Sequence, residues 1–190
     1  EATDILVTCG GSEAISIAIM ACFNPGDELI IPEPFYANYN GFACAAGVHV
    51  VPITSRIETG FGLPPIHDFE KVITPKTKAI VPVHLYGQAA PMEEIMAIAK
   101  KHNLFVIEDN AQAIGANCKF SDGTKKKAGT IGHVSSTSSF PSKNLGCYGD
   151  GGAIFTNDDD LAHKIRGIVN HGMYVRYHHD VVGVNSRLDS

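Results

Sequence analysis

Short apolar runs of strand length recur along the chain, and segments with helical periodicity follow several of them. Runs rich in Val, Ile and Leu are typical of buried strands. Alternation of such strands with helices favours a mainly parallel sheet covered by helices on both faces, so the expected fold class is a three-layer α/β/α arrangement. The expected strands are residues 4–8, 28–31, 48–53, 79–83, 104–107 and 153–156.

Residues at the ends of the expected helices indicate the same organisation. Ser12 is suited to cap a helix that runs to about Phe23. Pro91 fits the first turn of another helix, whose far end carries the cations of residues 100–102, as the helix dipole favours. The three aspartates at 158–160 are interpreted as a helix start and not as a metal site.

Length, composition and charge fit one α/β domain, residues 1–190, of a soluble protein. Of the 190 residues 44% are hydrophobic. The net charge of -5 and the pI near 6.0 give no reason to expect nucleic acid. The basic run 125–127 follows the turn-like 121–123 and is interpreted as a solvated hairpin tip. No apolar stretch approaches about 20 residues, so no membrane span is expected.

The cysteines indicate a reducing compartment. They are odd in number and lack close pairing, so we expect reduced thiols in a cytoplasmic protein and favour this over a catalytic cysteine. The chain starts at Glu1 and not at methionine, which leaves room for a targeting segment upstream. The cysteines are Cys9, Cys22, Cys44, Cys118 and Cys147.

The strongest chemical signal is a lysine in a serine-rich turn, downstream of an acid that ends an apolar strand. Lys143 follows Asp109 by 34 positions. A lysine amine can hold the aldehyde of pyridoxal phosphate (PLP) as a Schiff base, and an acid can keep the pyridine nitrogen protonated. An ionised Glu108 or Asp109 would need a cationic partner at a buried strand end, and a pyridinium is one. Magnesium would use similar acids, but no second carboxylate cluster follows at another strand end.

The ordinary interpretation of Lys143 is a surface lysine in a polar loop. Apolar neighbours argue against it, because such packing favours the neutral amine that Schiff-base formation requires. These neighbours are Phe140, Pro141, Leu145, Cys147 and Tyr148.

Two other segments offer phosphate-binding groups. Gly10, Gly11 and Ser12 lie between the first strand and the first helix, where glycines admit an anion and free amides favour a phosphate. Many strand-to-helix turns use the same residues for conformational reasons, so this signal depends on its partners. The segment has neither the Gly-Lys-Ser/Thr of a Walker loop nor dinucleotide spacing. Ser138, five residues before Lys143, would turn a second hydroxyl towards the phosphate.

Two ring side chains follow strands on the side where ligands of open α/β sheets bind. Phe35, in the proline-stiffened loop 32–36, could stack on a planar cofactor or pack beneath the loop. His84 could contact the cofactor ring or the substrate, or pack. The histidines at 171, 178 and 179 have no evident metal-ligand set, so no metal site is expected.

In this order and spacing, the elements resemble the cofactor-binding large domain of fold-type I PLP enzymes, the aspartate aminotransferase superfamily. Residues 1–80 are similar to class I, aspartate-type aminotransferases, in 7–14, 24–28 and 32–39. Residues 81–190 are similar to the DegT/DnrJ/EryC1/StrS sugar aminotransferases, in 82–88, 108–112, 140–152 and 183–187. We therefore hypothesise a recombined or engineered chimera with a seam near 73–80, since 84–87 replace the Asn-Pro-x-Gly turn of a class I enzyme.

The resemblance implies a role for each candidate residue. Lys143 would form the Schiff base and move the substrate proton, and Asp109 would pair with the ring nitrogen. Asn185 would reach the phosphate of a neighbouring subunit, which implies a homodimer. Ser139 departs from the sugar family, where this position is usually aromatic. The remaining contacts implied are Gly11, Ser12, Glu13 and Ser138 to the phosphate, Phe35 stacked on the ring, and Gln112 to the ring hydroxyl.

The reaction implied is amino transfer from an amino acid, glutamate, to a keto acceptor. The second half of the chain favours a nucleotide-linked keto-sugar, and the first half a keto acid. The resemblance also implies that an amino-terminal segment and a carboxyl-terminal small domain lie outside this chain. The alternatives are a non-catalytic PLP-fold fragment and a lyase or dehydratase. The latter is disfavoured because some sugar dehydratases of this family carry histidine where this chain has Lys143.

Overall fold

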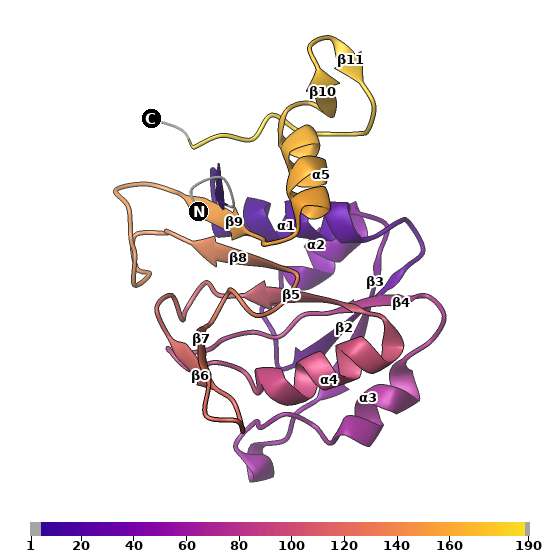
Figure 1. The fold of residues 1–190 in the computed structure, drawn as a ribbon, viewed down its shortest axis with the longest axis vertical. Helices are drawn as coiled ribbons and strands as arrows, with labels where there is room; N and C mark the ends of the chain where they lie inside the picture. Colours follow the sequence, from indigo (N-terminus) through magenta and orange to yellow (C-terminus); the bar gives the residue numbers. More distant parts are fainter. Residues whose placement is uncertain (1–4, 189–190) are drawn as a thin grey trace.

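A seven-stranded sheet runs through the centre of the computed structural model, which describes residues 5–188 (Figure 1). The strand order is β1-β9-β8-β5-β4-β2-β3. Only β9 runs antiparallel to its neighbours, so the mainly parallel sheet is confirmed. The strands are β1 (Ile5–Thr8), β2 (Glu28–Glu33), β3 (His49–Thr54), β4 (Thr77–Ile80), β5 (Phe105–Asp109), β8 (Val134–Ser138) and β9 (Gly152–Phe155).

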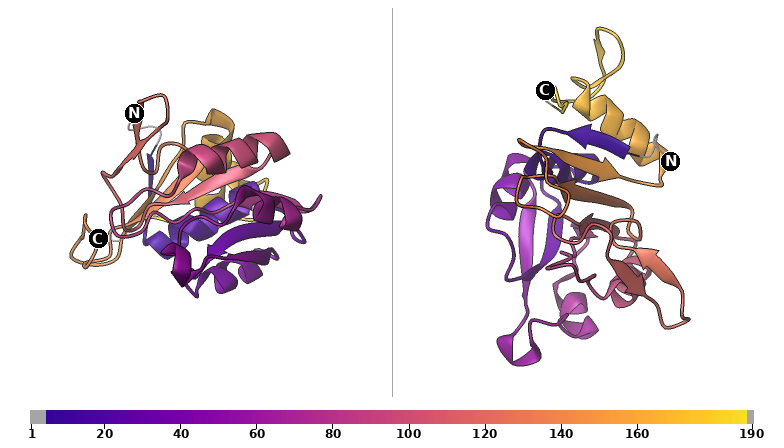
Figure 2. Two further views of the ribbon diagram at one scale, coloured as in Figure 1. Left: turned by 90° about the horizontal axis from the view of Figure 1, so that it is seen from below. Right: turned by 90° about the vertical axis from the view of Figure 1, so that its left-hand side faces the viewer.

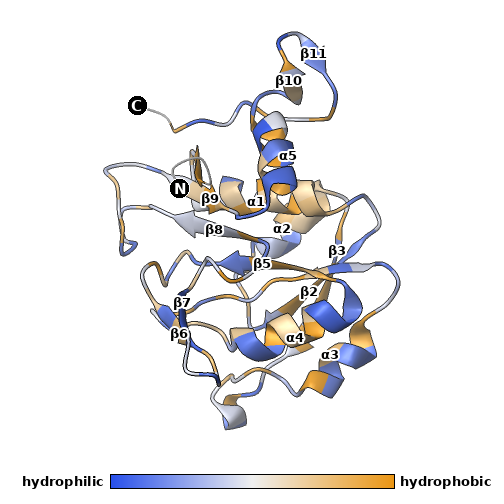
Figure 3. Cartoon of the chain, viewed as in Figure 1, coloured by the Kyte–Doolittle hydropathy of each residue, from blue (hydrophilic) through white to orange (hydrophobic). Residues whose placement is uncertain are grey.

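Helices cover both faces of the sheet, which gives the expected three layers (Figure 2). Successive residues of a central strand face opposite layers. Ile107 packs with α1, α2 and α5, and Val106 packs with α3 and α4. The end of β5 is hydrophilic, as Figure 3 shows. The helices are α1 (Gly11–Cys22), α2 (Tyr39–Ala45), α3 (Ile66–Val72), α4 (Met92–His102) and α5 (Asp159–Val169), with a 3-10 turn at Ile57–Thr59.

The helix ends agree with the sequence except at α1. Gly10 is the N-cap of α1, and Ser12 lies inside its first turn, so the prediction of a Ser12 cap is wrong. Pro91 is the N-cap of α4. Asp158 caps α5, since its Oδ1 accepts the Leu161 N–H at 2.9 Å.

Two hairpins lie outside the central sheet. They are β6 (Asn117–Lys119) with β7 (Lys125–Lys127), and β10 (Met173–Val175) with β11 (His178–His179), which projects from one end of the molecule (Figure 1). The run 125–127 is exposed, as expected, but it forms β7 and not the hairpin tip, which lies at 121–124. Among residues 5–188, no helix combines the length and apolar character needed to cross a membrane. All five cysteines are free thiols.

Strand β8 was missing from the expected elements, and it carries Ser138. Its central residues Ser135, Ser136 and Thr137 are buried but polar, so they give no apolar run. Hydroxyl hydrogen bonds to the carbonyl oxygens of residues 129 and 110 satisfy Ser135 and Thr137. With β8 in place, the carboxyl ends of β1, β5 and β8 meet at one edge of the sheet.

Candidate functional site

The glycine turn before α1 packs directly against the end of β8. A Cβ atom on Gly11 would lie 2.6 Å from the Cβ of Ser138, so only glycine permits this approach. The first backbone hydrogen bond of α1 joins the Ala14 N–H to the Gly10 oxygen at 2.9 Å. The three helical amides before it, those of residues 11–13, are the free donors of a helix start. Together with the Ser138 hydroxyl they make a group of donors of the kind that can bind an anion, the anion corner at the sheet edge.

Asp109 ends β5 one strand away from Ser138, and its carboxylate is held from two sides. Oδ1 accepts the Ala111 N–H at 3.0 Å, and Oδ2 accepts the hydroxyl proton of Tyr39 at 2.6 Å. The side chain is half-buried. Because a carboxylate offers about four lone-pair sites, it can still accept a further donor.

Glu108 and Asp109, which the sequence alone did not separate, have different surroundings. Glu108 is fully buried. Its Oε2 accepts from His84 Nε2 at 2.7 Å and from the Gly129 N–H at 2.8 Å. Its Oε1 accepts the Ile131 and Gly132 N–H groups at 2.7 and 2.5 Å. Glu108 is therefore a structural anion, and Asp109 is the acid of the candidate site.

The pKa of Glu108 lies below its ordinary value. Burial alone would raise this pKa, but the hydrogen bonds from His84, Gly132 and Gly129 stabilise the carboxylate and outweigh it. The site therefore contains a buried anion directly beside Asp109 in the chain.

His84 lies in the core, which agrees with packing, one of the two roles that the sequence left open for it. Its ring is fully buried, and both nitrogens have protein partners. Nδ1 accepts the Ala90 N–H at 3.0 Å, so the proton is on Nε2, which donates to Glu108. The His84 backbone N–H donates to the backbone carbonyl oxygen of Asp109 at 2.9 Å. His84 thus supports the end of β5, an arrangement that spacing alone did not reveal.

Lys143 lies in a turn of the segment that joins β8 to β9. Figure 1 shows this segment extending outside the sheet. The Lys143 backbone N–H donates to the Phe140 carbonyl oxygen at 2.8 Å. The Cys147 backbone N–H donates to the Ser139 carbonyl oxygen, also at 2.8 Å. The lysine is half-buried. The expected apolar enclosure does not form within this chain, because Phe140, Leu145 and Tyr148 are exposed.

Phe35, the residue expected to stack on a cofactor, lies close to two other aromatic residues, Tyr36 and Tyr39. The ring of Phe35 is half-buried and packs edge-on against Tyr39, with 6.3 Å between ring centroids. Tyr36, next to it, is exposed. Stacking of Phe35 on a cofactor stays a prediction. Tyr39 was missed, since its contact with Asp109 spans 70 residues.

Glu13 and Ser186 meet near the start of α1, and Asn185 is the chain neighbour of Ser186. The Glu13 carboxylate accepts the Cys9 N–H at 2.9 Å and the Ser186 hydroxyl proton at 2.6 Å. Burial opposes ionisation, but these hydrogen bonds bring the pKa of Glu13 below its ordinary value. Only its amide remains for a phosphate. Asn185 is exposed beside Ser186, and the role of Gln112, whose backbone oxygen accepts the Gly87 N–H, stays a prediction.

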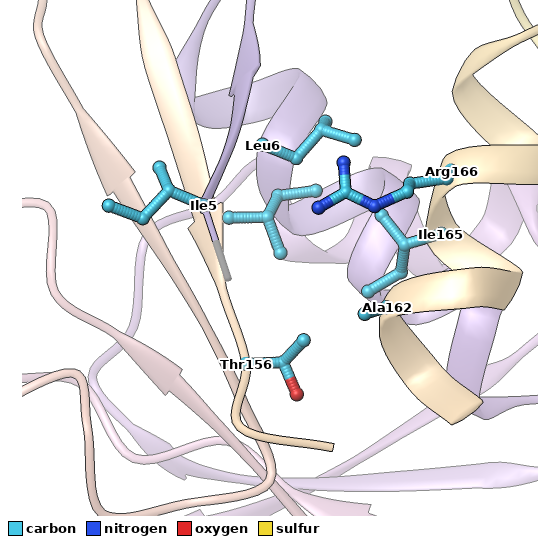
Figure 4. A pocket seen from close by; sticks show the side chains of 7 residues that line it. Ile5, Leu6, Thr156, Ala162, Ile165 and Arg166 are labelled. Atoms are coloured by element: carbon cyan, nitrogen blue, oxygen red, sulfur yellow. The ribbon is translucent and has the colours of Figure 1, made fainter. Parts of the chain in front are cut away.

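Two cavities lie away from these groups. Figure 4 shows one of about 10 Å³ between the start of β1 and α5, room for about one water molecule. A second, of about 180 Å³, lies at the start of β8 and the end of β9. Neither is lined by a predicted site residue. Within residues 5–188, no group of three metal-ligating side chains is placed to hold an ion.

The fold matches that of solved PLP-dependent aminotransferases. A solved structure with this fold is ntda from Bacillus subtilis with bound cofactor PMP (TM-score 0.82, 32% identity, covering 97% of this chain and 41% of that chain). The sequence profile of the DegT/DnrJ/EryC1/StrS aminotransferase family matches residues 1–190, so the chain belongs to this family.

Two curated relatives show how much of a whole protein is present. The "Pleiotropic regulatory protein" of Geobacillus stearothermophilus is 49% identical, over 96% of this chain and 48% of its own length. The "UDP-2-acetamido-2-deoxy-3-oxo-D-glucuronate aminotransferase" of Pseudomonas aeruginosa is 48% identical, over 97% of this chain and 50% of its own. The chain spans about half the length of these relatives.

These matches remove the basis for the two-family hypothesis. The family profile covers residues 1–80 as well as 81–190, and both relatives align with nearly all of the chain. Nothing in the comparisons supports an aspartate-type half or a seam near 73–80. Residues 1–80 therefore belong to the same family match as the rest of the chain.

Proposed function

We propose that this chain is the PLP-binding domain of an aminotransferase that moves the amino group of glutamate to a nucleotide-linked keto-sugar. The observation that carries the proposal is the position of three groups, each of which follows a strand at the same edge of the sheet. The anion corner of Gly11 and Ser138, the carboxylate of Asp109 and the turn of Lys143 all follow the carboxyl end of the sheet.

The residues of this edge fit PLP. Because Gly11 has no Cβ, it packs closely on Ser138, and the amides of residues 11–13 and the Ser138 hydroxyl can donate to the phosphate. Asp109 retains lone pairs that can accept from a ring nitrogen. PLP, when bound, supplies an electron sink for a substrate carbanion. Asp109 would hold the proton on the ring nitrogen. Lys143 would bind the aldehyde carbon and move the proton at the substrate carbon.

The acceptor and the assembly belong to the same proposal. The name of the Pseudomonas aeruginosa relative supports a nucleotide-linked keto-sugar acceptor, and therefore a place in sugar biosynthesis. We assign Asn185, Gln112 and Phe35 the cofactor contacts that their family positions imply. The exposed Phe140, Leu145 and Tyr148 beside the lysine turn favour burial by a second subunit, and hence a homodimer. The free cysteines support a location in the cytoplasm.

The test is the amino-transfer half-reaction. The chain is loaded with PLP, its absorption spectrum is recorded, and glutamate is added. We expect conversion of PLP to pyridoxamine phosphate with release of 2-oxoglutarate, and loss of the reaction in Lys143→Ala but not in Lys126→Ala, a substitution in the exposed hairpin. Lys143-dependent PLP binding without conversion would leave a non-catalytic cofactor-binding domain. A folded chain that binds no PLP would refute the proposal.

A further inference from the structure

A buried phenol lies behind the acid of the candidate site. Tyr39 begins α2, yet only 1% of its surface is exposed. Phe35 and Phe42 contact its ring edge-on, with centroid distances of 6.3 and 6.0 Å. These contacts fix the ring so that its hydroxyl is 2.6 Å from Asp109 Oδ2. Tyr39 therefore cannot move away from Asp109 without disturbing the core.

The hydrogen bond has a defined direction. Burial, followed by the charge of Asp109 and the hydrogen bond to it, raises the pKa of Tyr39 well above its ordinary value. Tyr39 stays protonated over the whole physiological range, so its hydroxyl is the donor and Asp109 the acceptor.

We propose that Tyr39 is a positioning residue that orients the Asp109 carboxylate towards the ring nitrogen of the cofactor, an inference that rests on the proposed function. Terminal carboxylate torsions are broad, so one hydrogen bond leaves the group free to turn. The Ala111 N–H holds Oδ1, and Tyr39 holds Oδ2. This pair fixes the plane of the carboxylate and leaves a lone-pair site on each oxygen.

Tyr39→Phe isolates the hydroxyl. The substitution keeps the ring and its aromatic contacts, and water can reach the half-buried Asp109, so the variant is expected to fold. The dissociation constant of PLP, measured by equilibrium dialysis, should rise about tenfold, as expected for loss of a hydrogen bond to a charged group. Tyr177→Phe, in an exposed segment, is the matched control and should leave this constant unchanged.

A double-mutant cycle separates positioning from a general structural role. Asp109→Asn should weaken PLP binding, and adding Tyr39→Phe to it should weaken binding by less than about twofold. Thermal unfolding of the chain without cofactor should shift little in Tyr39→Phe. Unchanged PLP affinity in Tyr39→Phe, or an equal loss in the Asp109→Asn background, overturns the inference. If the unsubstituted chain shows no Lys143-dependent binding, the proposed function itself fails.

Discussion

The buried Glu108 carboxylate gives the most sharply defined prediction, because the whole end of β5 depends on it. Each of its oxygens accepts two hydrogen bonds, Oε1 from Ile131 and Gly132, and Oε2 from His84 and Gly129. In Glu108→Gln one oxygen becomes an NH₂ group, which faces two donors. His84 cannot relieve the conflict by moving its proton, because its Nδ1 already accepts from Ala90.

The expected loss in unfolding free energy follows from the number of donors left without an acceptor. A buried donor left without a partner costs about 1–3 kcal/mol, so two such donors cost about 2–6 kcal/mol. Domains of this kind have a free energy of unfolding of about 5–15 kcal/mol, so the variant should be near its stability limit. Chemical unfolding followed by circular dichroism measures the change as a lower midpoint at unchanged slope. Glu94→Gln, on the exposed side of α4, is the control and should change little.

The same carboxylate predicts a pH dependence. The pKa of Glu108 is lower in the folded chain than its ordinary value of 4.5. Below that ordinary value the unfolded chain binds the proton first, so the stability from Glu108 is present above it and is lost as pH falls towards the folded pKa. The gap in unfolding free energy between the unsubstituted chain and Glu108→Gln should narrow as the pH falls through this range. A gap below about 1 kcal/mol at neutral pH would refute the account of this network.

Two further predictions concern the close approach of Gly11 to Ser138 and the burial of Cys22. Gly11→Ala would place a Cβ 2.6 Å from the Cβ of Ser138, so we expect a loss of about 1–3 kcal/mol in unfolding free energy and weaker PLP binding. The control Gly41→Ala has open space around its Cβ inside α2 and should raise the unfolding free energy by up to about 1 kcal/mol. A Gly11→Ala variant as stable as the unsubstituted chain would contradict the close approach. Burial raises the pKa of Cys22 to about 12, so a thiol reagent at pH 8 should label the exposed Cys44 in the folded chain and Cys22 only after unfolding. Rapid labelling of Cys22 in the folded chain would show that its burial is wrong.

The sequence predicted the layers of the fold because apolar runs identify buried strands. Residues 28–31 and 104–107 are continuous apolar or nearly apolar segments, and they became β2 and β5. Strand β8 was missed for the converse reason. Its buried hydroxyls are satisfied by carbonyl oxygens from other segments, and a one-dimensional pattern does not show such partners.

The sequence indicated which residues make up the candidate site, but it did not show which side chains they contact. Gly11 and Ser138 were expected to share the phosphate, and the structure packs them together. The sequence left His84 open between a contact with cofactor or substrate and packing, and the structure places its side chain in the core beside Glu108. Tyr39 lies inside a motif that the sequence singled out, yet its hydrogen bond to Asp109 depends on the folding of distant segments against each other.

The most direct test of the central claim is to locate the covalent attachment of PLP. The chain is mixed with PLP, reduced with borohydride, digested and mapped by mass spectrometry, with Lys143→Ala treated in parallel. We predict one dominant phosphopyridoxyl group on Lys143, and its absence from the variant without transfer to another lysine. Equal labelling of exposed lysines such as Lys125–Lys127, or a dominant label that persists in Lys143→Ala, would contradict the proposed cofactor site.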